Sequence, residues 1–161
     1  MIFAAWILVL GMLTFFFHQW WEKENNPNQE VSSRLTSEGV REIKLQRNRV
    51  GHYVATGRIN NKKVVFLLDT GATTISIPET TARKLKLEPG LPYTVHTANG
   101  EATVYATRLK KLELGAILLQ DVRAHINPHM QGNEILLGMT VLKKLELIQK
   151  GDTLTLRQYP R

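Results

Sequence analysis

The sequence predicts a mostly β domain that follows an apolar segment at the N-terminus. Its length of 161 residues suits one domain of ordinary size. Beyond Val40 the apolar residues alternate with polar ones at the spacing of β-strands, and signals for helices are scarce. Apolar residues make up 43% of the chain and charged residues only 22%, so the chain can bury a core rather than remain disordered.

The composition excludes several kinds of site. The chain contains no cysteine, so it has no disulfide framework, thiolate zinc site, iron–sulfur cluster or cysteine nucleophile. The 21 Lys and Arg residues against 14 Asp and Glu give a formal charge of +7. This charge permits attraction to anionic lipid, nucleic acid or an acidic partner, but it does not select among them.

The first predicted element is a transmembrane helix over residues 1–21. Met1 to Phe17 carries no charge, and with Trp20 and Trp21 a helix of this segment would span about 30 Å, the thickness of a bilayer core. A cleaved signal peptide and a buried core helix are the alternatives. No Lys or Arg begins the segment and no small residues mark a cleavage site, so we expect an uncleaved anchor. The acidic flank that follows favours a body outside the cytoplasm.

Residues 22–39 are predicted to form a polar, flexible linker, and residues 40–161 the folded domain. The linker segment has few large apolar side chains, so it cannot build a core. Two copies anchored in one membrane by such linkers could meet readily, which would favour dimerisation.

The domain is predicted to consist mainly of antiparallel hairpins. Strands 53–59 and 63–68 are joined by Asn60-Asn61, whose side chains tolerate positive φ. Strands 93–97 and 102–106 flank Ala98-Asn99-Gly100-Glu101, which contains the Asn-Gly turn dipeptide. Helix is limited to a short segment from Pro78 to Leu85 and a turn or two over 140–144. Further strands are expected at residues 40–45, 108–114, 117–126, 134–137, 145–149 and 153–158.

One short motif can carry chemistry. The apolar strand 64–68 runs directly into Asp69-Thr70-Gly71-Ala72. A carboxylate at the end of a buried strand is costly unless it is hydrogen-bonded, exposed at a turn or used chemically. Asp, Thr and Gly are ordinary turn residues, so the tripeptide taken alone is better explained as a polar junction between a strand and a turn.

The order of several features changes this interpretation. After Asp69 come Ile75-Ser76-Ile77, a short helix, the Thr97-Ala98-Asn99-Gly100 hairpin tip, and Leu136-Leu137-Gly138-Met139 with Leu142; Gly51-His52-Tyr53 precedes the first long hairpin. In these residues and their spacing, from about residue 40 to 158, the chain resembles the retropepsin-like aspartic proteases, specifically their membrane-anchored bacterial members. The resemblance implies an all-β, closed β-barrel-type acid protease half with one or two short helices after the transmembrane helix. It also implies a place in the bacterial inner membrane with the protease domain in the periplasm.

The same resemblance implies roles for individual residues. Asp69 would be the catalytic carboxylate, Thr70 would brace the active-site loop, and Gly71 would let backbone N–H groups approach the carboxylates. Ala72 would support the same loop, and Gly138 would sit where the late apolar strand passes through it. The hairpin would be a flap that closes over an extended peptide, with the substrate bound by its tip residues Ala98, Asn99 and Gly100. The resemblance implies no metal and no organic cofactor.

A single such aspartate implies two chains. Aspartic proteolysis needs two carboxylates around one water, one ionised and the other protonated. The chain has one Asp-Thr-Gly, and Asp121 and Asp152 lack the flanking glycine and apolar strand. We therefore expect a homodimer with Asp69 of each subunit on the twofold axis, terminal strands in the interface, and a peptide or protein as substrate. The rival interpretation is a membrane-tethered module of the same fold that binds peptides or proteins without hydrolysing them.

Two other groups of residues are expected to carry no chemistry. His125, His129 and Glu134 suggest a metal site, but Pro128 breaks the helix that the histidine spacing would require, so we expect no metal there. Basic clusters at 83–86, 108–111 and 143–144 are scattered over separate elements without stacked aromatic residues. We therefore interpret them as solvated faces and expect no nucleic-acid partner.

Overall fold

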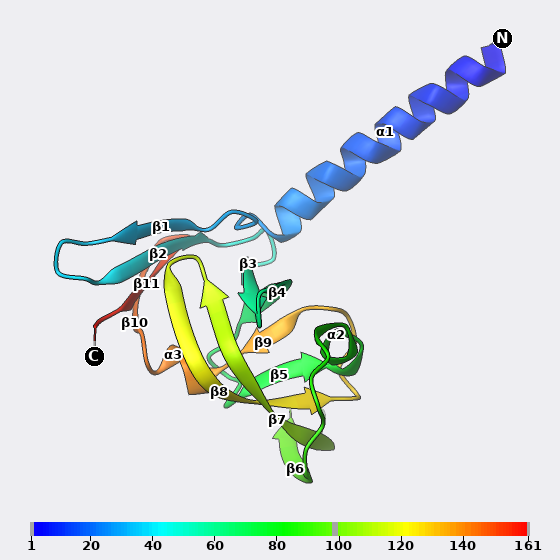
Figure 1. The fold of residues 1–161 in the computed structure, drawn as a ribbon. Helices are drawn as coiled ribbons and strands as arrows, with labels where there is room; N and C mark the ends of the chain where they lie inside the picture. The colour runs from blue at the N-terminus through cyan, green and yellow to red at the C-terminus, as the bar shows by residue number, and fades with distance from the viewer. Residues whose placement is uncertain (1, 98–99, 161) are drawn as a thin grey trace.

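The computed structural model describes residues 2–97 and 100–160, and it consists of a β body from which one long helix projects (Figure 1). The helix is α1 (Ile2–Asn25), and two short helices, α2 (Glu79–Leu85) and α3 (Met139–Leu142), belong to the body. The strands are β1 (Ser32–Leu35), β2 (Arg41–Gln46), β3 (Tyr53–Ile59), β4 (Lys62–Leu68), β5 (Ile75–Pro78), β6 (Pro92–Thr97), β7 (Gly100–Leu114), β8 (Ile117–Asn127), β9 (Ile135–Leu137), β10 (Glu146–Lys150) and β11 (Thr153–Gln158).

Two sheets form the body. The larger has the strand order β3-β4-β9-β5-β8-β7-β6, and pairing of β3 with β7 closes six of these strands into a barrel. The closure brings backbones close together at Gly57, where an added Cβ would lie against the carbonyl oxygen of Glu113 and the ring of Phe66. The mostly β, barrel-type fold predicted from the sequence is therefore confirmed.

The prediction that the domain consists mainly of antiparallel hairpins misses two parallel pairings. β4 pairs with β9 in parallel, and β5 pairs with β8 in parallel. The first exception arises because β9, which comes late in the chain, inserts between β4 and β5, and the second because β5 pairs with β8 rather than with a strand next to it in sequence. Local hairpin signals do not report such an insertion, since they describe only strands that follow one another in sequence.

The core fills the barrel and the space between the two sheets. Phe66 of β4, Ile75 and Ile77 of β5, and Leu109 of β7 are fully buried inside the larger sheet. The second sheet, in the order β1-β2-β11-β10, is antiparallel throughout. Its alternate side chains are buried against the barrel, as the period of two requires, and they are Ile43, Leu45, Leu154 and Leu156.

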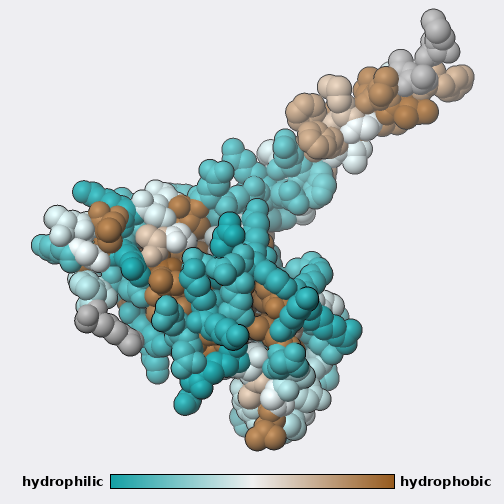
Figure 2. Space-filling model, in the orientation of Figure 1, coloured by the Kyte–Doolittle hydropathy of each residue, from teal (hydrophilic) through white to brown (hydrophobic). Residues whose placement is uncertain are grey.

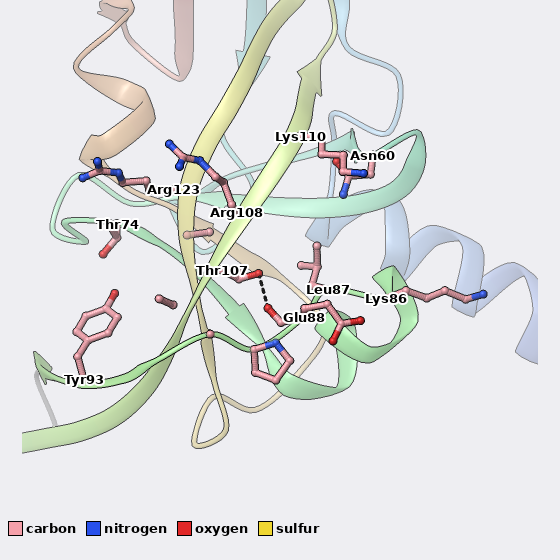
Figure 3. A pocket seen from close by; sticks show the side chains of 14 residues that line it. Asn60, Thr74, Lys86, Leu87, Glu88, Tyr93, Thr107, Arg108, Lys110 and Arg123 are labelled. Atoms are coloured by element: carbon pink, nitrogen blue, oxygen red, sulfur yellow. Dashed lines mark hydrogen bonds between the residues drawn. The ribbon is translucent and has the colours of Figure 1, made fainter.

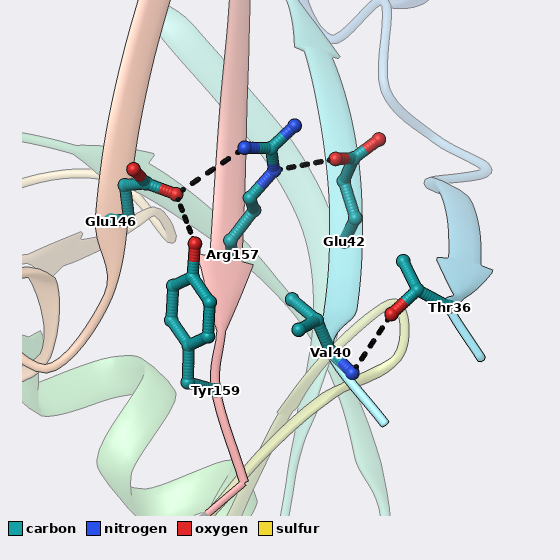
Figure 4. A network of polar contacts seen from close by, with 6 residues as sticks. All are labelled: Thr36, Val40, Glu42, Glu146, Arg157 and Tyr159. Carbon is teal, nitrogen blue, oxygen red and sulfur yellow. Dashed lines mark hydrogen bonds and ion pairs between the residues drawn. The ribbon is translucent and has the colours of Figure 1, made fainter. Parts of the chain in front are cut away.

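The outer face of the second sheet carries a row of charges. Arg157 of β11 lies between β2 and β10, and its Nε–H donates to Glu42 at 2.7 Å while its NH1 reaches Glu146 at 3.5 Å (Figure 4). The hydroxyl of Tyr159 also donates to Glu146, at 2.8 Å. The hydrogen bond from Arg157 holds the pKa of Glu42 below its usual value. The terminal strands are thus joined by side chains as well as by the sheet ladder.

The N-terminal helix differs from its surroundings in hydropathy. Figure 2 shows apolar side chains on the outer part of α1 and hydrophilic ones where the helix approaches the body. Among the residues that the structure describes, no helix is both long and apolar enough to cross a membrane, so the transmembrane helix expected over residues 1–21 is not supported.

Residues 22–39, expected to be a flexible linker, are built into the fold. Residues 22–25 continue α1, and β1 pairs with β2. Between them, the buried amide of Asn28 accepts from the backbone N–H of Gln46 at 2.7 Å and donates to the carbonyl oxygens of Gln46 and Val54 at 2.8 and 2.7 Å. One polar side chain thereby binds the segment to both sheets. The low apolar content of residues 22–39 therefore does not make this segment flexible.

We expect the substitution Asn28→Ala to lower the free energy of unfolding by about 2 kcal/mol, because it leaves backbone groups of Gln46 and Val54 without partners in a buried place. Urea unfolding followed by circular dichroism would measure the loss. Asn25→Ala, which changes an exposed amide three residues earlier, is the matched control and should leave the midpoint unchanged. Equal midpoints for both variants would contradict this account of Asn28.

Candidate active site

The carboxylate of Asp69 lies at the point where β4 leaves the barrel. β4 is central in the sheet because it pairs with β3 on one side and β9 on the other. The ladder with β9 continues one step beyond the strand, since the N–H of Asp69 donates to the carbonyl oxygen of Leu137 at 3.2 Å. The residue is half-buried, so its side chain reaches the surface from a backbone held by the core.

A tight turn surrounds this carboxylate. The N–H of Gly71 donates to Asp69 Oδ1 at 2.8 Å, and the N–H of Ala72 donates to the Asp69 carbonyl oxygen at 3.3 Å. A Cβ on residue 71 would lie 3.2 Å from Oδ1, so glycine allows the backbone to approach the carboxylate closely. Thr70 and Gly71 are exposed. The turn therefore presents a hydrogen-bonded carboxylate at the surface of a single chain.

The loop that carries Asp69 is held from behind by the segment after β9. The N–H of Met139 donates to the carbonyl oxygen of Ala72 at 2.8 Å, and both the N–H and the hydroxyl of Thr140 donate to that of Thr73 at 2.9 Å. A Cβ on Gly138 would lie 2.5 Å from the carbonyl oxygens of both Ala72 and Thr74. Only a residue without a side chain allows this packing.

The structure thus brings five of the residues singled out from the sequence, Asp69, Thr70, Gly71, Ala72 and Gly138, into one small region. Within the described residues, no hydrogen bond or ion pair joins Asp69 to another titratable side chain. One chain consequently offers one carboxylate at this place, and a reaction that needs two must obtain the second from elsewhere.

The hairpin expected to act as a flap is formed by β6 and the first part of β7. The two strands pair in register from Pro92 with Tyr105 to Thr97 with Gly100. Gly100 has a φ of 106°, which favours glycine, and the hydroxyl of Thr97 donates to its carbonyl oxygen at 2.8 Å. Ala98 and Asn99, the other two tip residues named from the sequence, lie outside the described residues.

The base of this hairpin is fastened by a pair that the sequence analysis did not find. The hydroxyl of Tyr93 lies 3.1 Å from Nδ1 of His125, and the two rings meet edge to face. His125 is buried on β8, and this burial lowers its pKa, while burial raises the pKa of Tyr93. His125 is thus a partner of β6. In the sequence, His125 is a histidine within a predicted strand of apolar residues, and this pattern does not indicate which residue would be its partner.

A cavity of about 760 Å³ adjoins the loop and the base of the hairpin (Figure 3). Thr74 of the Asp69 loop and Tyr93 of β6 face one another on one side of it. β7, β8 and the segment after α2 form the other walls, which include Lys86, Glu88, Arg108, Lys110 and Arg123. The cavity lining therefore combines the neutral side chains of Thr74 and Tyr93 with several cations, and one of these cations, Arg123, lies next to Thr74.

We expect Gly138→Ala to displace the Asp69 loop, since its methyl group would meet two backbone oxygens that cannot move independently of the sheet. The expected loss of stability is about 1–3 kcal/mol, as for an overpacked core. Thermal unfolding would measure it. Gly11→Ala in α1, where a Cβ meets nothing within 4 Å, is the control and should not destabilise the protein. An unchanged midpoint for Gly138→Ala would contradict the close packing described above.

Comparisons with known proteins agree with this geometry. Residues 55–144 match the model of the family described as "gag-polyprotein putative aspartyl protease". The chain is 30% identical over 166 aligned residues to an uncharacterised protein from the cobV 5′ region of a Sinorhizobium species, covering 96% of this chain and 71% of that one. It is 31% identical over 134 residues to an uncharacterised protein of Rickettsia prowazekii, covering 80% of this chain and 56% of the relative.

Two solved structures share the fold. The crystal structure of a retropepsin-like aspartic protease from Rickettsia conorii superposes with a TM-score of 0.60 at 27% identity, covering 80% of this chain and 95% of that one. The EIAV protease in complex with the inhibitor HBY-793 superposes with a TM-score of 0.50 at 20% identity, covering 62% and 92% respectively. The second likeness concerns the fold alone.

Proposed function

Because this chain belongs to the gag-polyprotein family of retropepsin-like aspartic proteases, we propose that it is an aspartic endopeptidase that works as a homodimer. Each subunit contributes Asp69, and the two carboxylates share one active site. The observation that carries this proposal is the turn at Asp69, in which a backbone N–H fixes the carboxylate at the surface and the segment after β9 holds the loop in place.

The chemistry follows from two carboxyl groups around one water. Like charges at close range cannot both ionise easily, so the pair shares a proton. The ionised carboxylate takes a proton from the water as the water oxygen attacks the peptide carbonyl carbon, and the protonated partner gives its proton to the carbonyl oxygen. Collapse of the tetrahedral diol breaks the C–N bond: the carboxyl group that took the water proton protonates the leaving nitrogen, and the other, now ionised, carboxylate takes a proton from a diol hydroxyl, which becomes the carbonyl of the new carboxylic acid and restores the shared proton. The residues that act are in the chain itself, and no metal or organic cofactor enters a step.

A second copy is proposed because one chain supplies one Asp-Thr-Gly and exposes it. Thr70 and Gly71 lie at the surface, and nearby Met139 is 36% exposed although it is apolar. The edge strand β10 is exposed along its whole length and carries Leu147 and Ile148. Exposed apolar side chains beside an open strand edge suit a self-complementary contact about a twofold axis. A place at a membrane, with the domain outside the cytoplasm, stays a prediction of the sequence.

The rival function is a module that keeps this fold and binds peptides or proteins without hydrolysis.

We expect Asp69→Asn to lower peptide cleavage by roughly 10³-fold or more, since it removes the ionisable group from both half-sites. Asp152→Asn is the matched control, because its carboxylate lies on the surface in an ion pair with Arg47, and it should retain activity.

Cleavage of a diverse peptide library by the full chain, followed by mass spectrometry, measures both variants. Analytical ultracentrifugation of each variant shows whether folding and dimerisation persist. Undiminished cleavage by Asp69→Asn, or cleavage by a strictly monomeric protein, would contradict the proposed function. A folded dimer that cleaves no member of the library would favour the rival.

A further inference from the structure

The cavity beside the Asp69 loop is lined by four cationic side chains and a single acidic one, Glu88; the cations are Lys86, Arg108, Lys110 and Arg123. We propose that this cavity binds an acidic side chain of the substrate peptide, at a position removed from the scissile bond. As a statement about the substrate, the inference rests on the proposed function, but binding of an acidic peptide can be measured without turnover.

The arrangement of two arginines is the first argument. Arg108 of β7 and Arg123 of β8 lie directly opposite one another in the antiparallel register. Like charges at such positions destabilise a sheet. Arg108 is partly compensated by an ion pair with Asp121, whereas no described residue forms an ion pair with Arg123. The two arginines therefore concentrate positive charge that contacts within the fold neutralise only in part.

The conformation of Lys86 is the second argument. It ends α2 with a φ of 59° and a ψ of 43°, the left-handed conformation in which glycine is the usual residue. Lys86 is among the lining residues at a position where glycine would be more stable, and its side chain extends away from the other lining side chains (Figure 3). Lys86 thus adds positive charge near the cavity, and the other cations of its lining come from β7 and β8.

The position of the cavity is the third argument. Thr74 follows Asp69 by five residues in the same loop, and the parallel register that pairs Ile75 with Ala124 brings Thr74 beside Arg123. Tyr93, at the base of the hairpin, faces Thr74 (Figure 3). A peptide held in extended form between the loop and the hairpin would advance about 3.3 Å per residue and point alternate side chains the same way. One of its side chains, and not the side chains of the two neighbouring residues, would enter the part of the cavity lined by Arg108 and Arg123.

A carboxylate is the anion that suits this place. Arginine binds carboxylates through parallel hydrogen bonds, and two arginines on adjacent strands can share one acidic group. The wall toward the Asp69 loop carries the hydroxyls of Thr74 and Tyr93, next to Arg123. Nucleic acid would need a longer cationic track and aromatic surfaces for its bases, and the cavity lining offers one aromatic residue.

The test uses the full chain and a peptide that it cleaves, prepared as pairs that differ by Glu or Gln at each position near the scissile bond. We expect Glu to raise kcat/KM about tenfold at one position and to have little effect at the positions on either side. Arg123→Gln should abolish this preference, and Arg123→Glu should replace it by a preference for Lys. Arg83→Gln removes the same charge from the exposed face of α2, outside the cavity, and should keep the preference.

Fluorescence anisotropy with Glu and Gln versions of a peptide that the chain binds, whether or not it is cleaved, separates this inference from the proposed function. Tighter binding of the Glu peptide, lost in Arg123→Gln but kept in Arg83→Gln, supports the inference even if no peptide is cleaved and the proposed function fails. Cleavage without any position that prefers Glu overturns the inference and leaves the proposed function standing. A preference that survives Arg123→Gln, or equal competition by a DNA oligonucleotide of the same charge, would also overturn it.

Discussion

The packing of Gly138 against the loop that carries Asp69 is the contact on which the candidate site depends. A Cβ at residue 138 would lie 2.5 Å from the carbonyl oxygens of Ala72 and Thr74, and the next two residues bind the loop through hydrogen bonds. The insertion of β9 between β4 and β5 makes this contact possible, because it brings the end of β9 behind the loop. Catalytic precision on a loop requires such support from rigid elements, since a loop without it would sample many positions of its carboxylate.

The same insertion explains why the site is open. β4 is fully engaged on both sides, so the chain must turn outward at Asp69, and the hydrogen bond from Gly71 fixes the side chain at the surface. The apolar side chains exposed beside this charged group are unfavourable in a monomer, because they stay in contact with water. In the proposed symmetric dimer these features would be complementary, since each copy would cover the other and supply the second carboxylate.

Those parts of the fold that depend on local chemistry could be predicted from the sequence. Asn60 and Asn61 adopt positive φ in the expected hairpin turn, and the Asp69 turn follows the expected apolar strand. The parallel pairings of β4 with β9 and of β5 with β8, the role of Asn28 and the Tyr93–His125 pair could not be predicted. Each joins residues more than twenty positions apart, and in none of them does the residue type alone indicate the distant partner. Local pattern contains no information on which distant backbone will be close enough to need such a partner.

Electrostatics connects these observations to the choice of substrate. A net charge of +7 is compatible with many anionic partners and by itself distinguishes none. The fold adds geometry: the β7–β8 register sets Arg108 against Arg123, and β5 places the end of the Asp69 loop next to them. Scattered cations thereby become a local positive field at the edge of the candidate site, near the base of the flap hairpin. A site that bound only apolar side chains would gain nothing from this unfavourable pairing, whereas a site that selects acidic peptides would use it in each binding event.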